Sequence, residues 1–534
     1  MQEANTNHSI PTAREKKYDR QLRLWAANGQ AALEEAHVLL VTASAAGAEI
    51  LKNLVLPGTG TFTIADDKLV TQQDVDVNFF LDEDSIGHSR AKKVTELLQE
   101  LNQDSTGISQ ILNLKELDQI DPSYWESFSL VVAHQIRPDV LIKLSSILWE
   151  NKIPLVVSRS IGFYASLRLV VPEHTVVESH PDSTVELRLD SPWPELEQLA
   201  ESVNLDELDD MEHAHVPYVI LLLKYLKKWK QEHNGDSPSN YAEKNQFKQL
   251  IKAGIRTNDP ENFEEAINAV WRASQKTEIP SSIKKILGDK RAQELTETST
   301  KFWILARAVA DFVLSPESDG HLPLSGTLPD MKADSASYIA LQNVYRDKAQ
   351  KDRNEVERHA HRHLQVIGRS TDSISREEIE TFAKFSSYLF VIDGRSVEEE
   401  YLTNPRSSTI LNGLDDSDDL THIYVGFRAV DLFEQKFDRY PGLFDDTKTD
   451  DSKELAAIAL NLVKNFGGEE VNDRTLNILQ EFVRAGGGEL HNISSLLGGI
   501  GAQEIVKILT KQYIPINNTV IFDGIQSKSQ VLQL

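Results

Sequence analysis

The stretch VLLVTASAAGAEILKNLVLPG, from Val38 to Gly58, most constrains how this chain can fold. It has the pattern of a buried strand, a tight turn and an amphipathic helix. Similar apolar runs (HVLLV, TFTIAD, SLVVAH and IPLVVS) alternate with helical periodicity between Ala36 and about Val171, and helices are expected to start near Ala46, Ser89 and Arg137. This alternation predicts an α/β fold with a doubly wound, mainly parallel sheet.

The pattern changes after this region. From 172 to 484 the sequence is mainly helical, with amphipathic segments such as PYVILLLKYLKKW and FWILARAVADFVL. The tail returns to a glycine-punctuated helix followed by a strand, as expected at the edge of the first domain. We therefore predict a discontinuous Rossmann-like domain, residues 1–171 and 485–534, interrupted by a helical inserted domain, residues 172–484.

Composition excludes several classes of function. The 534 residues carry a formal charge of −26, which repels nucleic acid and anionic membranes, so neither is an expected partner. No apolar run is long enough to span a bilayer, and the first residues lack the apolar core of a signal peptide, so an intracellular protein is expected. The sequence contains no cysteine, which excludes disulfides, thiolate metal sites and a cysteine nucleophile in this chain.

The turn after the first strand resembles a phosphate-binding turn that has lost its glycines. Thr42, Ser44 and Gly47 occupy the three positions of a G-x-G-x-x-G motif, so only the glycine that permits close helix packing remains. Asp66, at the end of the next strand, stands where a ribose-binding carboxylate is expected, although aspartates at strand ends also serve turns. The sequence therefore predicts a degenerate nucleotide turn, with these four residues as its remnants.

The segment REKKYDRQLRLW has two interpretations. At helical spacing Tyr18, Leu22 and Trp25 share one face, which leaves Arg20 and Arg23 on other faces. Two arginines there are most simply a solvated surface. Because a guanidinium presents a fixed fork of donors, a role at a triphosphate is chemically reasonable as well.

Histidines suggest a metal site only weakly. His359 and His363 lie four apart in ERHAHRHL and share a helix face, but no third ligand is marked in the sequence. We interpret them as surface or interface histidines on a long helix. His180, His213 and His215 are interpreted as parts of local structure, and no metal site is predicted.

Several motifs together resemble one family. YDRQLRLW, the Val38–Gly58 stretch and SIGHSRAKKVTELLQELN resemble the adenylation fold of enzymes that activate ubiquitin-like modifiers. NFFL, ELRLDSPWPEL, FWILARA, GTLPDMKADSASYIALQNVYRDKAQKD and RAVDLFEQKFDRYPG resemble, more specifically, the regulatory subunits of neddylation-activating enzymes. The resemblance extends from about Lys17 to Leu534, and it implies an inactive copy of the adenylation fold with a large helical insertion.

The resemblance also implies partners. Such a subunit forms a heterodimer with a catalytic subunit, which uses ATP and Mg²⁺ to adenylate a Nedd/Rub-type modifier. The catalytic subunit then holds the modifier as a thioester and passes it to a conjugating enzyme. This chain alone would bind no cofactor, and it would work in the cytoplasm and nucleus. The alternatives are a non-catalytic subunit serving another modifier such as SUMO, a stand-alone nucleotide enzyme, and a scaffold without a role at ATP.

The family's ATP-binding positions are altered in this chain. The arginine position falls on Val77, the lysine position falls on Arg90, and the magnesium-binding aspartate is replaced by His134 and Gln135. These changes imply that the site of this copy is inactive. The inserted domain resembles the domain that carries the catalytic cysteine in relatives, so here it would be a cysteine-free counterpart.

Two surfaces are implied to serve the catalytic partner. The family's arginine in YDRQLRLW reaches across the dimer to the ATP phosphates, which assigns that role to Arg20. The segment PDMKADSASYIALQN resembles the partner-contacting segment, and its assigned interface residues are Pro329, Asp330, Asp334, Tyr338, Leu341 and Asn343. The sequence leaves open whether Tyr338 and Leu341 are exposed or packed internally.

Overall fold

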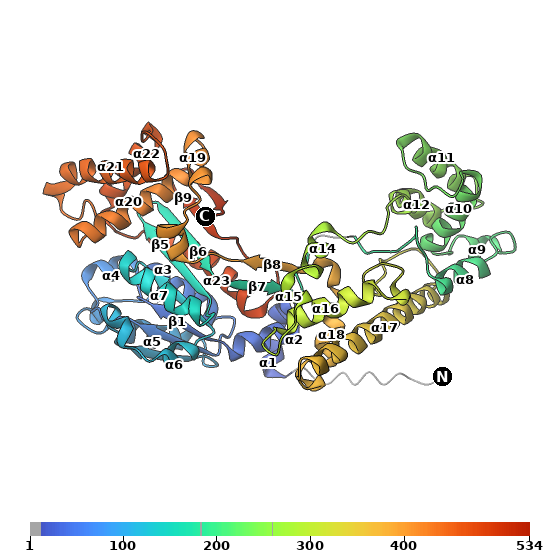
Figure 1. Cartoon of the computed structure of the whole chain (residues 1–534), viewed down its shortest axis with the longest axis horizontal. Coiled ribbons are helices and arrows are strands. Elements are labelled where there is room, and N and C mark those ends of the chain that lie inside the picture. Colours follow the sequence, from blue (N-terminus) through green and yellow to red (C-terminus); the bar gives the residue numbers. More distant parts are fainter. Residues whose placement is uncertain (1–11, 182–183, 259) are drawn as a thin grey trace. The chain divides into compact units, whose positions relative to one another are not determined.

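The structure is a computed structural model that describes residues 12–181, 184–258 and 260–534. These residues form two compact units, shown in Figure 1. The sheet unit contains residues 12–176 and 391–534, and the helical unit contains residues 177–390. Residues 1–11, which the sequence analysis assigned to the first domain, lie outside the described residues.

Among the described residues, eight strands form one mixed sheet in the order β10-β9-β6-β5-β4-β1-β2-β3. The neighbours β3, β2, β1, β4 and β5 run parallel, whereas β6, β9 and β10 are joined antiparallel. The predicted doubly wound sheet is confirmed, and so is the return of the C-terminal tail to its edge. The bounds are β1 His37–Val41, β2 Thr61–Ala65, β3 Thr106–Gln110, β4 Leu130–His134, β5 Leu155–Ile161, β6 Tyr164–Val170, β9 Thr519–Asp523 and β10 Lys528–Leu532.

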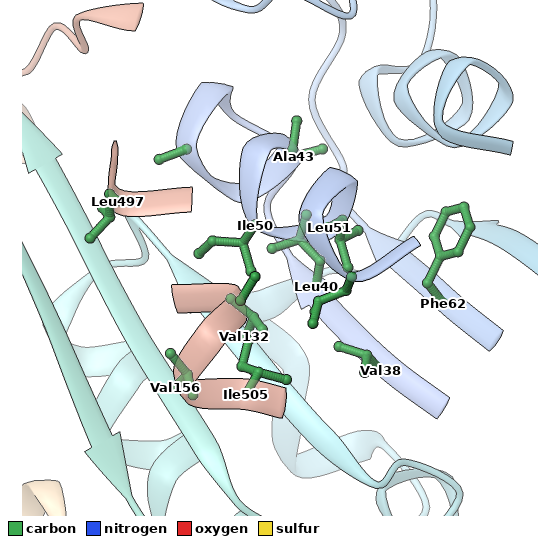
Figure 2. Close-up of a cluster of buried hydrophobic side chains, with 14 of the residues drawn as sticks. Val38, Leu40, Ala43, Ile50, Leu51, Phe62, Val132, Val156, Leu497 and Ile505 are labelled. Carbon is green, nitrogen blue, oxygen red and sulfur yellow. The ribbon is translucent and has the colours of Figure 1, made fainter. Parts of the chain in front are cut away.

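The core of the sheet unit joins both ends of the chain. Figure 2 shows Val38 and Leu40 of β1 beside Ile50 of α3 (Ala45–Val55), with Ile505 of α23 (His491–Thr510) in the same cluster. Helices α3 and α23 pack so closely that a Cβ at Gly498 would lie only 2.8 Å from the backbone of α3. The fold therefore depends on a helix more than 400 residues away from β1 in sequence.

The remaining helices of the sheet unit come from both of its chain segments. Helices α3, α5 and α7 begin where the sequence analysis expected them, near Ala46, Ser89 and Arg137. The bounds are α1 Ala13–Lys17, α2 Asp19–Glu35, α4 Gln72–Val77, α5 Arg90–Leu101, α6 Pro122–Glu126, α7 Pro138–Glu150, α19 Ser407–Asp415, α20 Thr421–Phe437, α21 Lys448–Asn465 and α22 Asp473–Ala485.

The compact units differ from the domain limits drawn from the sequence. Residues 391–484 were placed in the helical insertion, but they cluster with the sheet. The reason is packing: Phe482 of α22 lies against Tyr164 of β6, with ring centroids 5.3 Å apart, and Ile423 of α20 shares a core with Ile521 of β9. Helices α19 to α22 thus belong to the unit that contains the sheet.

The helical unit has its own core, in which Trp193, Phe263, Leu341 and Tyr345 are buried. Its longest helix, α17 (Ser335–Val366), lies beside α16 (Lys301–Val313) (Figure 1). The other helices are α8 Pro194–Ser202, α9 Asp210–His213, α10 Tyr218–Glu232, α11 Tyr241–Lys252, α12 Glu261–Asn268, α13 Val270–Ala273, α14 Ser281–Leu287, α15 Lys290–Gln293 and α18 Arg376–Lys384.

Two short strands, β7 (Glu173–Val176) and β8 (Phe390–Asp393), pair in a separate two-stranded sheet. In the described parts of the chain, none of the helices combines the length and apolar character that crossing a bilayer requires.

Candidate functional site

The turn between β1 and α3 keeps the backbone shape of a glycine turn without its glycines. Thr42 has a φ of 68°, in the left-handed region that favours glycine, and its hydroxyl donates a hydrogen bond to the carbonyl of His134. A Cβ at Gly47 would lie 2.8 Å from the Thr42 carbonyl oxygen, so glycine there lets α3 approach the strand. The turn therefore retains its packing role, while side chains fill the space that glycines would leave.

Asp66 is held by groups of this chain. It is 1% exposed, and its carboxylate accepts hydrogen bonds from the Ala43 amide at 2.8 Å and the Lys68 amide at 3.0 Å. The Arg90 guanidinium lies 2.7 Å from the same carboxylate and 2.7 Å from that of Asp74. Burial opposes the charge of Arg90, but the two carboxylates outweigh it and raise the pKa of the guanidinium. Asp66 and Arg90 thus brace the turn.

A carboxylate that the sequence analysis did not single out occupies the amino end of α3. Glu489 accepts hydrogen bonds from the backbone amides of Ala45 and Ala46, both at 3.1 Å. The His134 ring nitrogen Nε2 lies 3.0 Å from the same carboxylate, and Nδ1 lies 2.8 Å from the Ser158 hydroxyl. Free amides at a helix amino end attract anions, and here the chain supplies the anion itself.

The electrostatics of Glu489 match this position. Burial would raise the pKa of its carboxyl, but the electrostatic interaction and hydrogen bond with His134 and the Ala46 amide outweigh burial. The pKa of Glu489 is therefore held below its ordinary value. The side chains of His134 and Glu489 are 0% and 8% exposed, so this is a buried, hydrogen-bonded pair.

The structure brings the altered nucleotide positions together around one cleft. The cleft has a volume of about 620 Å³, and its lining includes Thr42, Ser44, Val77, Arg90, Gln135 and Glu489. A nucleoside triphosphate needs free amides and cations for its phosphate oxygens. Here the α3 amides are engaged by a carboxylate and Arg90 is engaged by two others. The residues present therefore do not fit ATP.

Arg20 lies on the first turn of α2, and its side chain is exposed. Within the part of the chain that the structure describes, it makes no hydrogen bond or ion pair. The nearby Arg23, in contrast, forms an ion pair with Asp19 at 3.1 Å. The preceding Tyr18 is buried, and its hydroxyl donates to Asp104 at 3.0 Å. Arg20 is thus a solvated cation on an anchored helix.

The segment assigned to the partner interface spans a loop and the start of α17 in the helical unit. Asp334 caps α17 by accepting a hydrogen bond from the Ser337 amide at 2.9 Å. Asp330 and Asn343 are exposed, whereas Pro329 and Tyr338 are half-buried. Leu341 is fully buried in the core of this unit, so its side chain is packed internally and is not exposed.

The histidines on α17 contact a carboxylate. His363 lies 2.7 Å from Asp311 of α16, which also pairs with Arg307 at 3.0 Å. His359 is 5% exposed and lies 3.2 Å from Glu355. The interpretation of His359 as a surface or interface residue is wrong, because it is packed within the helical unit. Among the described residues, no group of three or more potential ligands is placed to hold a metal ion.

The other histidines have local contacts. His213 stacks on Phe263 with ring centroids 4.9 Å apart, and His215 lies 2.7 Å from the Met211 carbonyl. His180 lies 3.8 Å from Glu178. Both positions in MEHAHVP are thus explained by helix and core structure.

Comparison with known proteins defines the class. The model of the ThiF family matches residues 18–534. The NEDD8-activating enzyme E1 regulatory subunit of Xenopus laevis is 45% identical, covering 98% of this chain and 99% of its own length. The subunit of the same name from Gallus gallus is 43% identical, covering 98% of each chain, and the subunit AXL of Arabidopsis thaliana is 39% identical, covering 97% of this chain and 99% of its own.

The matched regions are longer than the adenylation fold alone, because they also include the helical unit. The chain therefore belongs to the ThiF family and, within it, to the NEDD8-activating enzyme E1 regulatory subunits.

Proposed function

We propose that this chain is the non-catalytic subunit of a heterodimeric NEDD8-activating enzyme. With its catalytic partner it supports ATP-dependent adenylation of the modifier's C-terminal carboxylate. The partner's cysteine then takes the modifier as a thioester, and the conjugating enzyme receives it. We also propose that this subunit acts in both the cytoplasm and the nucleus.

The observation that carries the proposal is the occupied amino end of α3. Glu489 accepts hydrogen bonds from the amides that a triphosphate would use, and Asp66 forms an ion pair with Arg90. A chain with this cleft has no evident place for ATP of its own. The chemistry of adenylation then falls to the partner's site, where Mg²⁺ is also proposed to bind.

The lack of cysteine supports the same division of work. A thioester requires a thiolate nucleophile, and none of the 534 residues is a cysteine. The helical unit therefore supplies shape and contacts, and the thioester is held by the catalytic subunit.

Arg20 is proposed to act at the partner's ATP. Its guanidinium is exposed and unpaired among the described residues, so it is available to a phosphate without breaking an internal contact. A positioned cation stabilises the negative charge that develops as pyrophosphate departs. The exposed Asp330 and Asn343, with Pro329 and Tyr338, are proposed to contact the catalytic subunit.

The test replaces Arg20 in the assembled heterodimer. Arg20→Ala is expected to leave assembly intact and to lower the rate of ATP–pyrophosphate exchange roughly 10²-fold, as does removal of one charge-stabilising donor. Arg23→Ala is the matched control, since Arg23 is already paired with Asp19 on the same helix. Equal rates for both variants would remove Arg20 from the proposal.

A further inference from the structure

Glu489 has a donor set drawn from distant parts of the sheet unit. The residue follows Gly486–Gly488 and precedes α23, yet its carboxylate contacts the start of α3 and the end of β4. Besides the two α3 amides and His134, the Ser494 hydroxyl donates to it at 3.3 Å. Four donors thus converge on one buried anion.

This donor set is of the kind that binds a phosphate group. Helix amino-end amides favour anions through their free N–H groups and the helix dipole. His134, which is completely buried, adds a side-chain donor from a second element, so the set does not depend on the helix end alone. The adjoining cleft of about 620 Å³ gives an anion from solvent a route to these donors.

We propose that the Glu489 carboxylate is a built-in substitute for a phosphate group, and that it closes an anion site which this chain still possesses. The proposal rests on the same Glu489 contacts as the proposed function, but its test needs no catalytic subunit, so the two can fail separately. Loss of the turn glycines is then not the only change that blocks phosphate binding at the turn. The carboxylate satisfies donors that would otherwise remain buried and unpaired, which also stabilises the turn.

A simple helix cap predicts a different outcome. If Glu489 served only to cap α3, its removal would destabilise the fold without creating affinity for any anion. If it fills a phosphate position, its removal leaves a vacant, positively polarised site. Binding of inorganic phosphate to that site would then restore stability by mass action.

The experiment measures thermal unfolding of the full chain in inorganic phosphate and in chloride of equal ionic strength. The wild type is expected to gain in phosphate only the general stabilisation that this anion gives to folded proteins. Glu489→Ala is expected to unfold at a lower Tm in chloride and to recover most of the loss in phosphate. Glu489→Gln keeps the side chain in place without its charge, so we expect a smaller loss and no recovery beyond the general gain of the wild type.

Asp445→Ala is the matched control, because Asp445 lines the same cleft but is exposed and paired with Lys448. A gain in phosphate for Glu489→Ala that does not exceed that of Asp445→Ala would overturn the proposal. If Glu489→Ala does not fold in chloride, the yield of refolded chain in the two salts replaces Tm as the readout. A gain in yield in phosphate larger than that of Asp445→Ala supports the proposal, and a gain no larger than that of the control overturns it.

Discussion

Replacement of Arg90 by methionine tests whether this residue braces the turn. Its guanidinium lies 2.7 Å from both Asp66 and Asp74, and Asp66 is 1% exposed. Methionine fills similar volume but leaves a buried carboxylate without a cation. Removing one partner of a buried pair costs about 3–5 kcal/mol. We therefore expect Arg90→Met to lower the free energy of unfolding of the sheet unit by about this amount, which corresponds to a Tm lower by about 5–8 °C.

The effect should depend on pH in a defined direction. Burial raises the pKa of Asp74, but the Thr71 hydroxyl and the charge of Arg90 outweigh burial and hold it below its ordinary 3.8. Its contribution to stability is therefore present above pH 3.8 and is lost as pH falls through the lower, folded-state value. In Arg90→Met this contribution is reduced. The difference in stability from wild type should shrink on acidification, because protonation of Asp74 removes a charge that has lost its partner.

The assay is urea unfolding of the full chain at neutral and acidic pH, followed by circular dichroism. Lys92→Met is the control, since Lys92 lies on the same helix in an exposed pair with Glu96 at 3.8 Å. Such a pair contributes at most about 1 kcal/mol. If Arg90→Met lost no more stability than Lys92→Met, the assignment of Arg90 as a structural brace would be refuted.

Three further predictions concern the interface segment and the turn. Leu341→Ala should destabilise the helical unit by about 2–5 kcal/mol in urea unfolding, because it leaves a cavity in the core. Asn343→Ala, at an exposed position, should leave unfolding unchanged and weaken co-purification with the catalytic subunit; a loss of stability instead would place it in the core. A Thr42→Gly, Ser44→Gly double variant should show no ATP turnover, because Glu489 still engages the α3 amides. Measurable turnover in a luciferase-coupled assay would contradict that reasoning.

The sequence predicted the centre of the sheet better than its edges. The strands β1, β2, β4 and β5 are short apolar runs because both of their faces are covered. The edge strand β3, TGISQ, has no buried residue, so it carried no hydrophobic signal. Its pairing with β2 depends on backbone hydrogen bonds that a single sequence does not display.

The assignment of residues 391–484 to the helical insertion shows a second limit of prediction from sequence. Helical periodicity identified the helices, but it does not state what covers their apolar faces. Helix α20 is buried over most of its length, including His422 and Thr421, because strand β9 and helices α7, α19, α21 and α22 contact it. That environment is a tertiary property.

The sequence predicted which nucleotide-binding residues the candidate site lacks, but it did not predict that Glu489 occupies their place. The missing glycines at Thr42 and Ser44 are visible in the sequence, as is the lack of a carboxylate beside His134. Glu489 follows a glycine run that marks a loop, but nothing local connects it with a turn 444 residues earlier. Only the folded sheet unit brings the carboxylate to α3.

The most direct test of the account is ATP–pyrophosphate exchange by this chain, with and without its catalytic partner. The purified chain with ATP, Mg²⁺ and a Nedd/Rub-type modifier should show no exchange above the background without protein. Addition of the catalytic subunit should produce exchange that depends on the modifier. Exchange by the chain alone would contradict the account, since it would require a working adenylation site in the cleft where Glu489 occupies the α3 amides.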